Sequence, residues 1–338
     1  MRGLVAPSTT VVVRVSDFDL DDLARAAALV ARHVPPTPQL EWPLLSAHAR
    51  STVIVKHENH TPVGAFKVRG GLVYFDRLAR ERPDVAGVIS ATRGNHGQSL
   101  AFAGRVYGRD VTIVVPHDNS VEKNAAMRAL GADVIEYGDD FQAAREHSVV
   151  LASSLGLEAV PPFHPDLVLG VATYARELFD GAGPLDTVYV PIGMGSGANA
   201  MIAVRDLLSL DTQIVGVVAA AAPATRLSFE AGRVITTERA DTFVDGVACR
   251  TPDPESLAGI VRGARRVIEV SDDAVAEAMR VIFRSTHNVA EPAGAIALAG
   301  LLSESPAERG VRCASPLCGG NVDTDTFAAV LAGSTPPP

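Results

Sequence analysis

A single lysine, Lys67, stands between an aromatic residue and a glycine turn in the segment A-F-K-V-R-G at residues 65–70. Burial and the nearby cation Arg69 would both favour the neutral amine, because each disfavours a further positive charge. A neutral lysine amine can attack an aldehyde and form a Schiff base. An isolated lysine near the start of a helix is far more often a solvated surface group, so this chemistry needs support from other motifs.

A glycine-rich loop at residues 193–197 lies between an apolar run and a helical pattern. The backbone N–H groups of such a loop can bind an anion together with the helix N-terminus, and the missing side chains allow close approach. The pattern Gly193-x-Gly195-x-x-Ala198 also fits a dinucleotide fingerprint, but residues 216–222 lack the acidic residue that this fingerprint requires. We therefore expect a single phosphate monoester here; a tight turn without a ligand is the structural alternative.

Two more polar groups follow apolar runs. Asn95 comes directly after Gly94 at the entrance to a helical pattern, where its amide can both donate and accept hydrogen bonds. Cys318 begins the segment C-G-G-N near the C-terminal end of the sequence. A Schiff-base lysine combined with a phosphate-binding loop indicates pyridoxal 5'-phosphate as the cofactor.

Five motifs in this order resemble the serine/threonine dehydratases of pyridoxal phosphate fold type II, a family that also contains serine racemases. They are A-F-K-V-R-G at 65–70, T-R-G-N-H-G-Q at 92–98, the glycine loop at 193–197, E-P-A-G-A at 291–295 and C-G-G-N-V-D at 318–323. The resemblance covers about residues 35 to 325. It implies a tryptophan synthase β-like α/β fold with two open parallel-sheet domains: a large domain of residues 1–82 and 166–338 and a small mobile domain of residues 83–165. It also implies a homodimer.

The resemblance assigns roles to individual residues. Lys67 would be the catalytic residue and would hold the cofactor, Asn95 would bond the ring hydroxyl, and the Asn95 loop would hold the substrate carboxylate. The expected cofactor-binding residues are Phe66, Lys67, Asn95, Gly193, Met194, Gly195, Ser196, Gly197, Glu291 and Cys318. The expected substrate-binding residues are Thr92, Arg93, Gly94, Asn95 and His96. His96 has a plain alternative as a structural partner, and Glu291 has one as a helix-start carboxylate.

Two of the departures from the family pattern bear on the type of reaction. Cys318 stands where many relatives have a serine that faces the pyridine nitrogen; a neutral group there favours β-elimination over transamination, and the sequence leaves open whether it is a thiol or a thiolate. Arg93 stands where the racemases have a serine, and a guanidinium cannot act as a base, so racemisation is disfavoured. Arg93 either contacts an anionic or hydroxylated substrate side chain or points outward into an ion pair.

A cation site that several relatives have after the strand ending at residues 216–218 is not expected here. Residues 218–224 read V-A-A-A-A-P-A and carry no side-chain oxygen for a hard cation. We predict no metal at this loop.

The predicted function is that of a pyridoxal-phosphate-dependent dehydratase, or ammonia-lyase, of amino acid metabolism. Lys67 would remove the α-proton of a 3-hydroxy amino acid such as L-threonine or L-serine, water would leave, and the product would hydrolyse to a 2-oxo acid and ammonia. Departures at Ala65, Arg93 and Met194 leave open a substrate with an aryl, carboxy or longer side chain. A β-replacement synthase is a further alternative. A non-catalytic amino-acid sensor is disfavoured, because a sensor need not keep Lys67.

Composition agrees with an enzyme for small molecules. The 338 residues are 47% hydrophobic, which is enough for a large core and about two domains. A net charge of −9 without a basic stripe makes a nucleic-acid partner unlikely. No secretory signal or membrane-length apolar run is readable, so we expect a cytoplasmic protein without a membrane partner. The 3 cysteines form no CxxC pair, which disfavours a disulfide framework or a structural zinc site.

Strands and helices alternate along the chain. Apolar runs at residues 85–91, 111–116, 134–137, 187–192 and 213–218 predict strands, and the patterns from about 95 and at 120–130, 141–155 and 198–208 predict helices. Short strands separated by helices of this length are typical of a parallel sheet. Gly108, Gly131 and Gly156 are expected to end helices in the left-handed conformation. We expect irregular connections near the site or an interface at residues 223–254.

Overall fold

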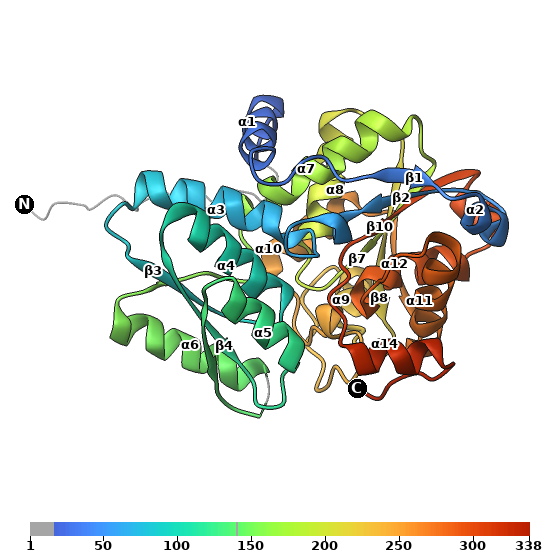
Figure 1. Cartoon of the computed structure of the whole chain (residues 1–338). Helices are drawn as coiled ribbons and strands as arrows, with labels where there is room; N and C mark the ends of the chain where they lie inside the picture. The colour runs from blue at the N-terminus through green and yellow to red at the C-terminus, as the bar shows by residue number, and fades with distance from the viewer. Residues whose placement is uncertain (1–16, 140) are drawn as a thin grey trace, which may run out of the picture.

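The protein consists of two sheets flanked by helices, as seen in a computed structural model that describes residues 17–139 and 141–338 (Figure 1). The α/β class and the two parallel sheets are confirmed. Residues 1–13, on which the absence of a secretory signal was argued, lie outside the described residues. Within the described ranges, no helix is both long enough and apolar enough to span a membrane.

The larger sheet has the strand order β1-β2-β10-β7-β8-β9. All neighbouring strands in it are parallel except β1 and β2 at its edge. It is therefore assembled from segments before and after the smaller sheet in sequence. The strands are β1 (Gln39–Glu41), β2 (Thr52–His57), β7 (Thr187–Pro191), β8 (Gln213–Ala219), β9 (Arg266–Val270) and β10 (Arg312–Leu317).

Alternation along β8 explains how helices cover both faces of this sheet. Ile214 and Val218 pack into a core with α7 (Pro165–Ala182) and α8 (Ser196–Leu207). Helix α10 (Pro254–Gly263) also contributes to this core. Val215 and Val217 point to the opposite face, where they meet α11 (Asp272–Thr286) and α12 (Pro292–Ser303). A strand buried on both faces needs a nearly continuous apolar sequence, which β8 has.

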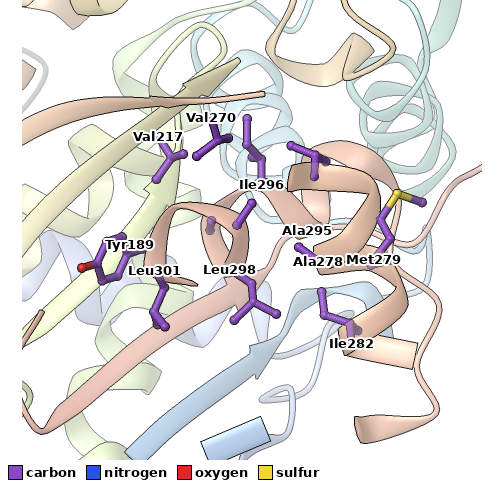
Figure 2. Packing of buried hydrophobic residues seen from close by; sticks show 14 of the residues in the cluster. Tyr189, Val217, Val270, Ala278, Met279, Ile282, Ala295, Ile296, Leu298 and Leu301 are labelled. Atoms are coloured by element: carbon purple, nitrogen blue, oxygen red, sulfur yellow. The ribbon is translucent and has the colours of Figure 1, made fainter. Parts of the chain in front are cut away.

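Helix α12 lies in the middle of the core on the α11 face of the larger sheet (Figure 2). Its sequence P-A-G-A-I-A-L-A-G-L-L-S is apolar on every side, as expected for a helix packed between a sheet and another helix. Figure 2 shows Ile296 near Val217 and Val270 of the sheet and Leu298 toward Ile282 of α11. This packing fixes the start of α12, where Glu291 is the N-cap.

The smaller sheet has the order β5-β4-β3-β6, and all of its strands are parallel. Along β4, Val111, Ile113 and Val115 pack toward α4 and α5, while Val114 faces α6. This period of two places helices on both faces. The elements are β3 (Gly87–Ala91), α4 (Asn95–Tyr107), β4 (Asp110–Val115), α5 (Val121–Ala129), β5 (Asp133–Glu136), α6 (Phe141–Leu155) and β6 (Glu158–Ala159).

The predicted elements between residues 85 and 155 and between 187 and 219 are confirmed to within a few residues. Gly108, Gly131 and Gly156 have φ of 62°, 98° and 64°, as expected. The expectation of irregular connections at residues 223–254 is wrong for part of that stretch. That stretch contains helix α9 (Ala224–Ala231) and the 3-10 turn η2 (Asp245–Val247), because α9 packs against α10 and β9 despite its polar sequence.

The remaining elements join the two sheets or cover their edges. They are α1 (Leu20–Val30), α2 (Pro43–Ala49), η1 (Glu58–His60), α3 (Lys67–Glu81), α13 (Pro306–Arg309) and α14 (Thr324–Leu331). The chain passes from the larger sheet to the smaller one through α3, which packs against both α4 and α7. The loops after β2, β3, β7 and β10 all leave carboxyl ends of strands, the usual place for a ligand site in open α/β sheets.

Candidate active site

Backbone pairing holds Lys67 beside the C-terminal motif. Ala65 forms an antiparallel bridge with Gly319, the Phe66 N–H donates to the Cys318 carbonyl at 3.0 Å, and the Gly320 N–H donates to the Gly64 carbonyl at 2.9 Å. These contacts join segments that are about 250 residues apart in sequence. Helix α3 starts at Lys67, directly after this paired segment, so its first side chain is placed next to Cys318.

The Lys67 amine has a local environment that favours its neutral form. Burial lowers the pKa of the Lys67 ammonium, against an opposing effect of the Glu291 carboxylate. Its Nζ lies 5.1 Å from the centre of the Phe66 ring. The expectation that repulsion from Arg69 contributes is wrong, because that guanidinium points away into a cluster of carboxylates.

That cluster is a fully paired ion network beneath the start of α3. Arg69 is fully buried and bonds Glu58 through Nε at 2.8 Å and Glu177 through Nη1 at 2.7 Å. Lys56 adds a second cation, at 2.6 Å from Glu177. Thr173 accepts a further bond from Arg69 at 3.1 Å. The network fixes α3 against α7 and leaves Arg69 no free donor for the site.

The glycine loop connects β7 to α8 in a form that only glycine permits. Gly195 has φ of 93°, and a Cβ there would lie 2.0 Å from Ser256 Oγ. A Cβ at Gly193 would lie 2.5 Å from the Gly246 carbonyl oxygen. The first N–H groups of α8 have no partner within the helix, so they can donate to an anion in the loop.

Asn95 and Glu291 meet across the site from Lys67. The Asn95 amide donates from Nδ2 to Glu291 Oε1 at 2.5 Å and accepts at Oδ1 from Asn321 at 2.8 Å. Burial raises the pKa of Glu291 to about 7, against the opposing effect of the Lys123 ammonium. Glu291 Oε2 is buried and has no hydrogen-bond partner among the described residues. An unsatisfied buried oxygen of this kind indicates a missing ligand group.

Lys123 and Asp245 form a buried connection beside Glu291. Lys123 lies in the first turn of α5 and pairs with Asp245 of η2. Burial opposes its charge, yet the pKa of Lys123 is raised because Asp245 and Glu291 face it. A Cβ at Gly94 would lie 2.6 Å from Lys123 Cδ, so a side chain at that turn would displace the lysine. Sequence reasoning missed this pair, because neither residue belongs to a motif.

Cys318 presents a neutral thiol. Its side chain is buried, and burial raises the pKa of the thiol far above its ordinary value. The question left open by the sequence is therefore answered in favour of the thiol form. A thiol is uncharged and cannot hold a proton on a basic ring nitrogen as a carboxylate would.

One cavity brings the predicted cofactor-binding residues together. Every one of them lines it: Phe66, Lys67, Asn95, Gly193, Met194, Gly195, Ser196, Gly197, Glu291 and Cys318. The cavity is also lined by Ala293 of the E-P-A-G-A motif and by residues that the sequence did not assign to the site, namely Val190, Pro191, Gly246 and Val247. Pro191 could have been found from its place next to the glycine loop, and Gly246 and Val247 lie in the stretch of residues 223–254 that was expected near the site or an interface.

Of the predicted substrate-binding residues, only Asn95 lines the cavity. Thr92 is buried and accepts the Gly94 N–H at 3.0 Å, so it shapes the turn. Arg93 is exposed, does not line the cavity and has no ion pair among the described residues. His96 is buried, and burial lowers its pKa to about 3, so it is neutral. The roles of these residues stay predictions.

The part of the chain that the structure describes contains no candidate metal-binding cluster. No group of 3 or more His, Cys, Asp and Glu side chains lies close enough together there to hold an ion. The predicted absence of a metal after β8 is not tested by this observation.

The lining fits a pyridine aldehyde that carries a phosphate. Burial favours the neutral form of the lysine amine, three of the five loop residues are glycines that leave the backbone N–H groups accessible, the thiol is uncharged, and Glu291 has a buried oxygen without a partner among the described residues. Each property matches one part of pyridoxal 5'-phosphate: its aldehyde, its phosphate and its ring.

Comparisons with known proteins agree with this fit. Residues 30–319 match the family model described as "Pyridoxal-phosphate dependent enzyme". The chain is 33% identical to the biosynthetic L-threonine dehydratase IlvA of Salmonella typhimurium over 88% of its own length, but it spans only 58% of that relative. It is 31% identical to an L-threo-3-hydroxyaspartate ammonia-lyase of Pseudomonas sp., with 92% of this chain and 98% of that relative covered. The structure of the processed form of threonine deaminase isoform 2 from Solanum lycopersicum superposes with a TM-score of 0.85 at 28% identity, covering 94% of this chain and 90% of that one.

Proposed function

Because the chain belongs to the family of pyridoxal-phosphate dependent enzymes, we propose that it is a lyase acting on 3-hydroxy amino acids. It would eliminate water from a substrate such as L-threonine or L-serine and yield a 2-oxo acid and ammonia. The names of the relatives that match over most of this chain support this activity. The observation that carries the proposal is the convergence of Lys67, the glycine loop and Cys318 on one cavity.

The residues divide the work of the reaction. Bound pyridoxal phosphate supplies an aldehyde and an electron-withdrawing ring that acidifies the α-carbon of an attached amino acid. Lys67 Nζ, whose pKa burial lowers, would hold the cofactor through its aldehyde, and once the incoming amino acid has displaced it the freed amine would accept the α-proton. The loop N–H groups bind phosphate at residues 193–197, and Asn95 orients the ring through its amide.

Two residues favour elimination over competing reactions. The neutral thiol of Cys318 would supply no charge to keep the ring nitrogen of a bound cofactor protonated, which would favour loss of the β-hydroxyl over transamination. Arg93 occupies the position where a racemase needs a second base, and a guanidinium cannot remove a proton. Water loss is therefore the reaction that the site supports best.

The first test is Lys67→Ala. This variant is expected to lose both turnover and the visible absorption of the Schiff base, because no other amine lines the cavity among the described residues. Circular dichroism should remain that of the parent protein. A variant that keeps 2-oxo acid formation would refute the assignment of Lys67. A protein that binds amino acids without turnover in either form would instead be the non-catalytic sensor.

The substrate side chain is the second question, and Arg93 is the residue that would bind an acidic one. A relative acting on L-threo-3-hydroxyaspartate matches the chain over nearly the full length of both proteins. Arg93→Ala should lower kcat/KM for L-threo-3-hydroxyaspartate about tenfold more than for L-threonine, which is the worth of one charged hydrogen bond. Arg105→Ala is the matched control, because Arg105 is also exposed and lies on the outer part of α4. Equal losses for both substrates would contradict an acidic substrate.

The assembly and its movements are further parts of the proposal. We propose a homodimer in the cytoplasm and a small domain of residues 83–165 that moves relative to residues 1–82 and 166–338. The separate four-stranded sheet between residues 87 and 159 supports the domain division. Light scattering would give the mass in solution, and hydrogen exchange with and without substrate would show whether residues 83–165 respond together. A β-replacement activity would appear as consumption of L-serine that requires a second nucleophile.

A further inference from the structure

The orientation of the Asn95 amide is fixed from both of its ends. A side-chain amide has an oxygen end that accepts hydrogen bonds and a nitrogen end that donates them, and the two ends have nearly the same shape. In Asn95, Oδ1 accepts from Asn321 Nδ2 at 2.8 Å, and Nδ2 donates to Glu291 Oε1 at 2.5 Å. The partners of this amide therefore decide which end is available at the candidate active site.

Asn321 can itself be oriented in only one way. Its Nδ2 also donates to the Val63 carbonyl oxygen at 2.8 Å, and a backbone carbonyl accepts hydrogen bonds but never donates them. The nitrogen end of Asn321 must therefore point at Val63, which leaves its second N–H for Asn95 Oδ1. A reversed Asn321 amide would place its oxygen against the Val63 carbonyl, with no hydrogen between the two acceptors.

The backbone beside Asn321 holds this amide in place. A Cβ at Gly64 would lie 2.6 Å from Asn321 Oδ1, so the chain passes the amide more closely than any other residue would allow. The Gly320 N–H donates to the Gly64 carbonyl, next to Asn321 in sequence. The pairing of distant segments that places Lys67 thus also places Asn321.

Glu291 completes the orientation at the other end of Asn95. Asn95 and Glu291 both line the cavity, whereas Asn321 does not. A flipped Asn95 amide would place its oxygen against the Glu291 carboxylate, which is again a pair of acceptors. In the observed orientation, one N–H of Asn95 Nδ2 bonds Glu291, and the other has no partner among the described residues. The amide group that Asn95 offers at the cavity is therefore a donor.

We propose that Asn321 is a positioning residue that fixes the Asn95 amide with its nitrogen end available at the cavity, so that Asn95 acts as a hydrogen-bond donor toward bound pyridoxal phosphate. This inference rests on the cofactor of the proposed function. Because Asn321 does not line the cavity, its effect on cofactor binding passes through Asn95.

The test is a double-mutant cycle of Asn321→Leu and Asn95→Ala, measured as the Kd of pyridoxal 5'-phosphate in an absorption titration at pH 8. Leucine has a branched side chain of similar shape but no hydrogen to donate, so Asn95 Oδ1 loses its partner. The Kd is expected to increase about tenfold for Asn95→Ala and about threefold to tenfold for Asn321→Leu, the worth of one hydrogen bond. In the Asn95→Ala background, Asn321→Leu is expected to change the Kd by less than about twofold.

This dependence on Asn95 separates a positioning role from a structural one. An Asn321 side chain that only held the backbone at Val63 would give the same increase in Kd in both backgrounds. Asn321→Asp provides a second variant should Asn321→Leu not fold, because a carboxylate keeps the shape of the amide and has no hydrogen to donate. It is expected to show the same dependence on Asn95.

Asn288→Leu is the matched control. Asn288 is also half-buried, donates from Nδ2 to a backbone carbonyl, that of Thr286, and does not line the cavity. This variant should leave the cofactor Kd within about twofold of the parent value.

Three results would overturn the inference. They are a Kd that neither substitution of Asn321 changes, equal increases in the two backgrounds, and an Asn95→Ala variant with the Kd of the parent, since Asn321 would then have no contact to position. A parent protein that shows no visible absorption band with pyridoxal 5'-phosphate would instead refute the proposed function itself. The two failures are therefore distinguishable in one set of titrations.

Discussion

The buried carboxyl of Glu291 should make the apoprotein less stable at neutral and alkaline pH. Its pKa rises from 4.5 to about 7 on folding, mainly because of burial. The folded state therefore binds this proton more tightly than the unfolded state, and stability falls as pH increases from 4.5 to about 7. A shift of about 2.5 units corresponds to about 3 kcal/mol. Glu291→Gln removes this cost and can still accept the bond from Asn95.

Urea unfolding of the two apoproteins across pH would measure this effect. The free energy of unfolding of Glu291→Gln minus that of the parent should increase by about 3 kcal/mol between about pH 4.5 and about pH 8. Titrating groups that do not face Glu291 cancel in the difference, and the measurement ends at about pH 8 because the pKa values of the facing Lys67 and Lys123 also depend on the Glu291 charge. Glu81→Gln, at an exposed position on α3, controls for the loss of a surface carboxylate. A difference that does not change with pH would refute the reasoning that Glu291 is buried and has an unsatisfied oxygen.

Two further substitutions test the surroundings of Lys67. Arg69→Met leaves the buried Glu58 without its cation, so the free energy of unfolding measured with urea should fall by about 3–5 kcal/mol. Arg80→Met removes one partner of an exposed pair and should lower the same quantity by about 1 kcal/mol at most. Equal losses would contradict the ion network. Cys318→Ser keeps a neutral group at the ring, so the variant should retain the Schiff-base absorption. Its kcat should stay within about tenfold of the parent value, since a single neutral hydrogen bond is exchanged. Loss of the absorption would show that the thiol has a specific role.

The sequence was informative where local patterns decide the structure. Apolar runs and glycine caps placed most elements of the smaller sheet and of β7 to β8. Within the site, the glycine loop could be interpreted from its composition, because close backbone approach and left-handed φ leave few alternatives to glycine. Helix α9 was missed, since its 8 residues are too short for a clear helical period and their packing against α10 and β9 is not visible in sequence.

Long-range features could not be predicted from residue patterns alone. Lys67 and Cys318 are brought together by backbone bonds between distant segments, and only the family resemblance anticipated this. Lys123 carries no motif, because its role comes from the two carboxylates that face it after folding, those of Asp245 and Glu291. The suggested effect of Arg69 failed for the same reason, as its carboxylate partners were not visible in sequence.

The most direct test of the account is the visible absorption spectrum of the purified protein during addition of L-threonine, L-serine and L-threo-3-hydroxyaspartate, with 2-oxo acid measured in the same samples. The account predicts a Schiff-base band that depends on Lys67 and that shifts on addition of at least one of these amino acids while 2-oxo acid and ammonia form. A protein saturated with pyridoxal 5'-phosphate that shows no such band would contradict it.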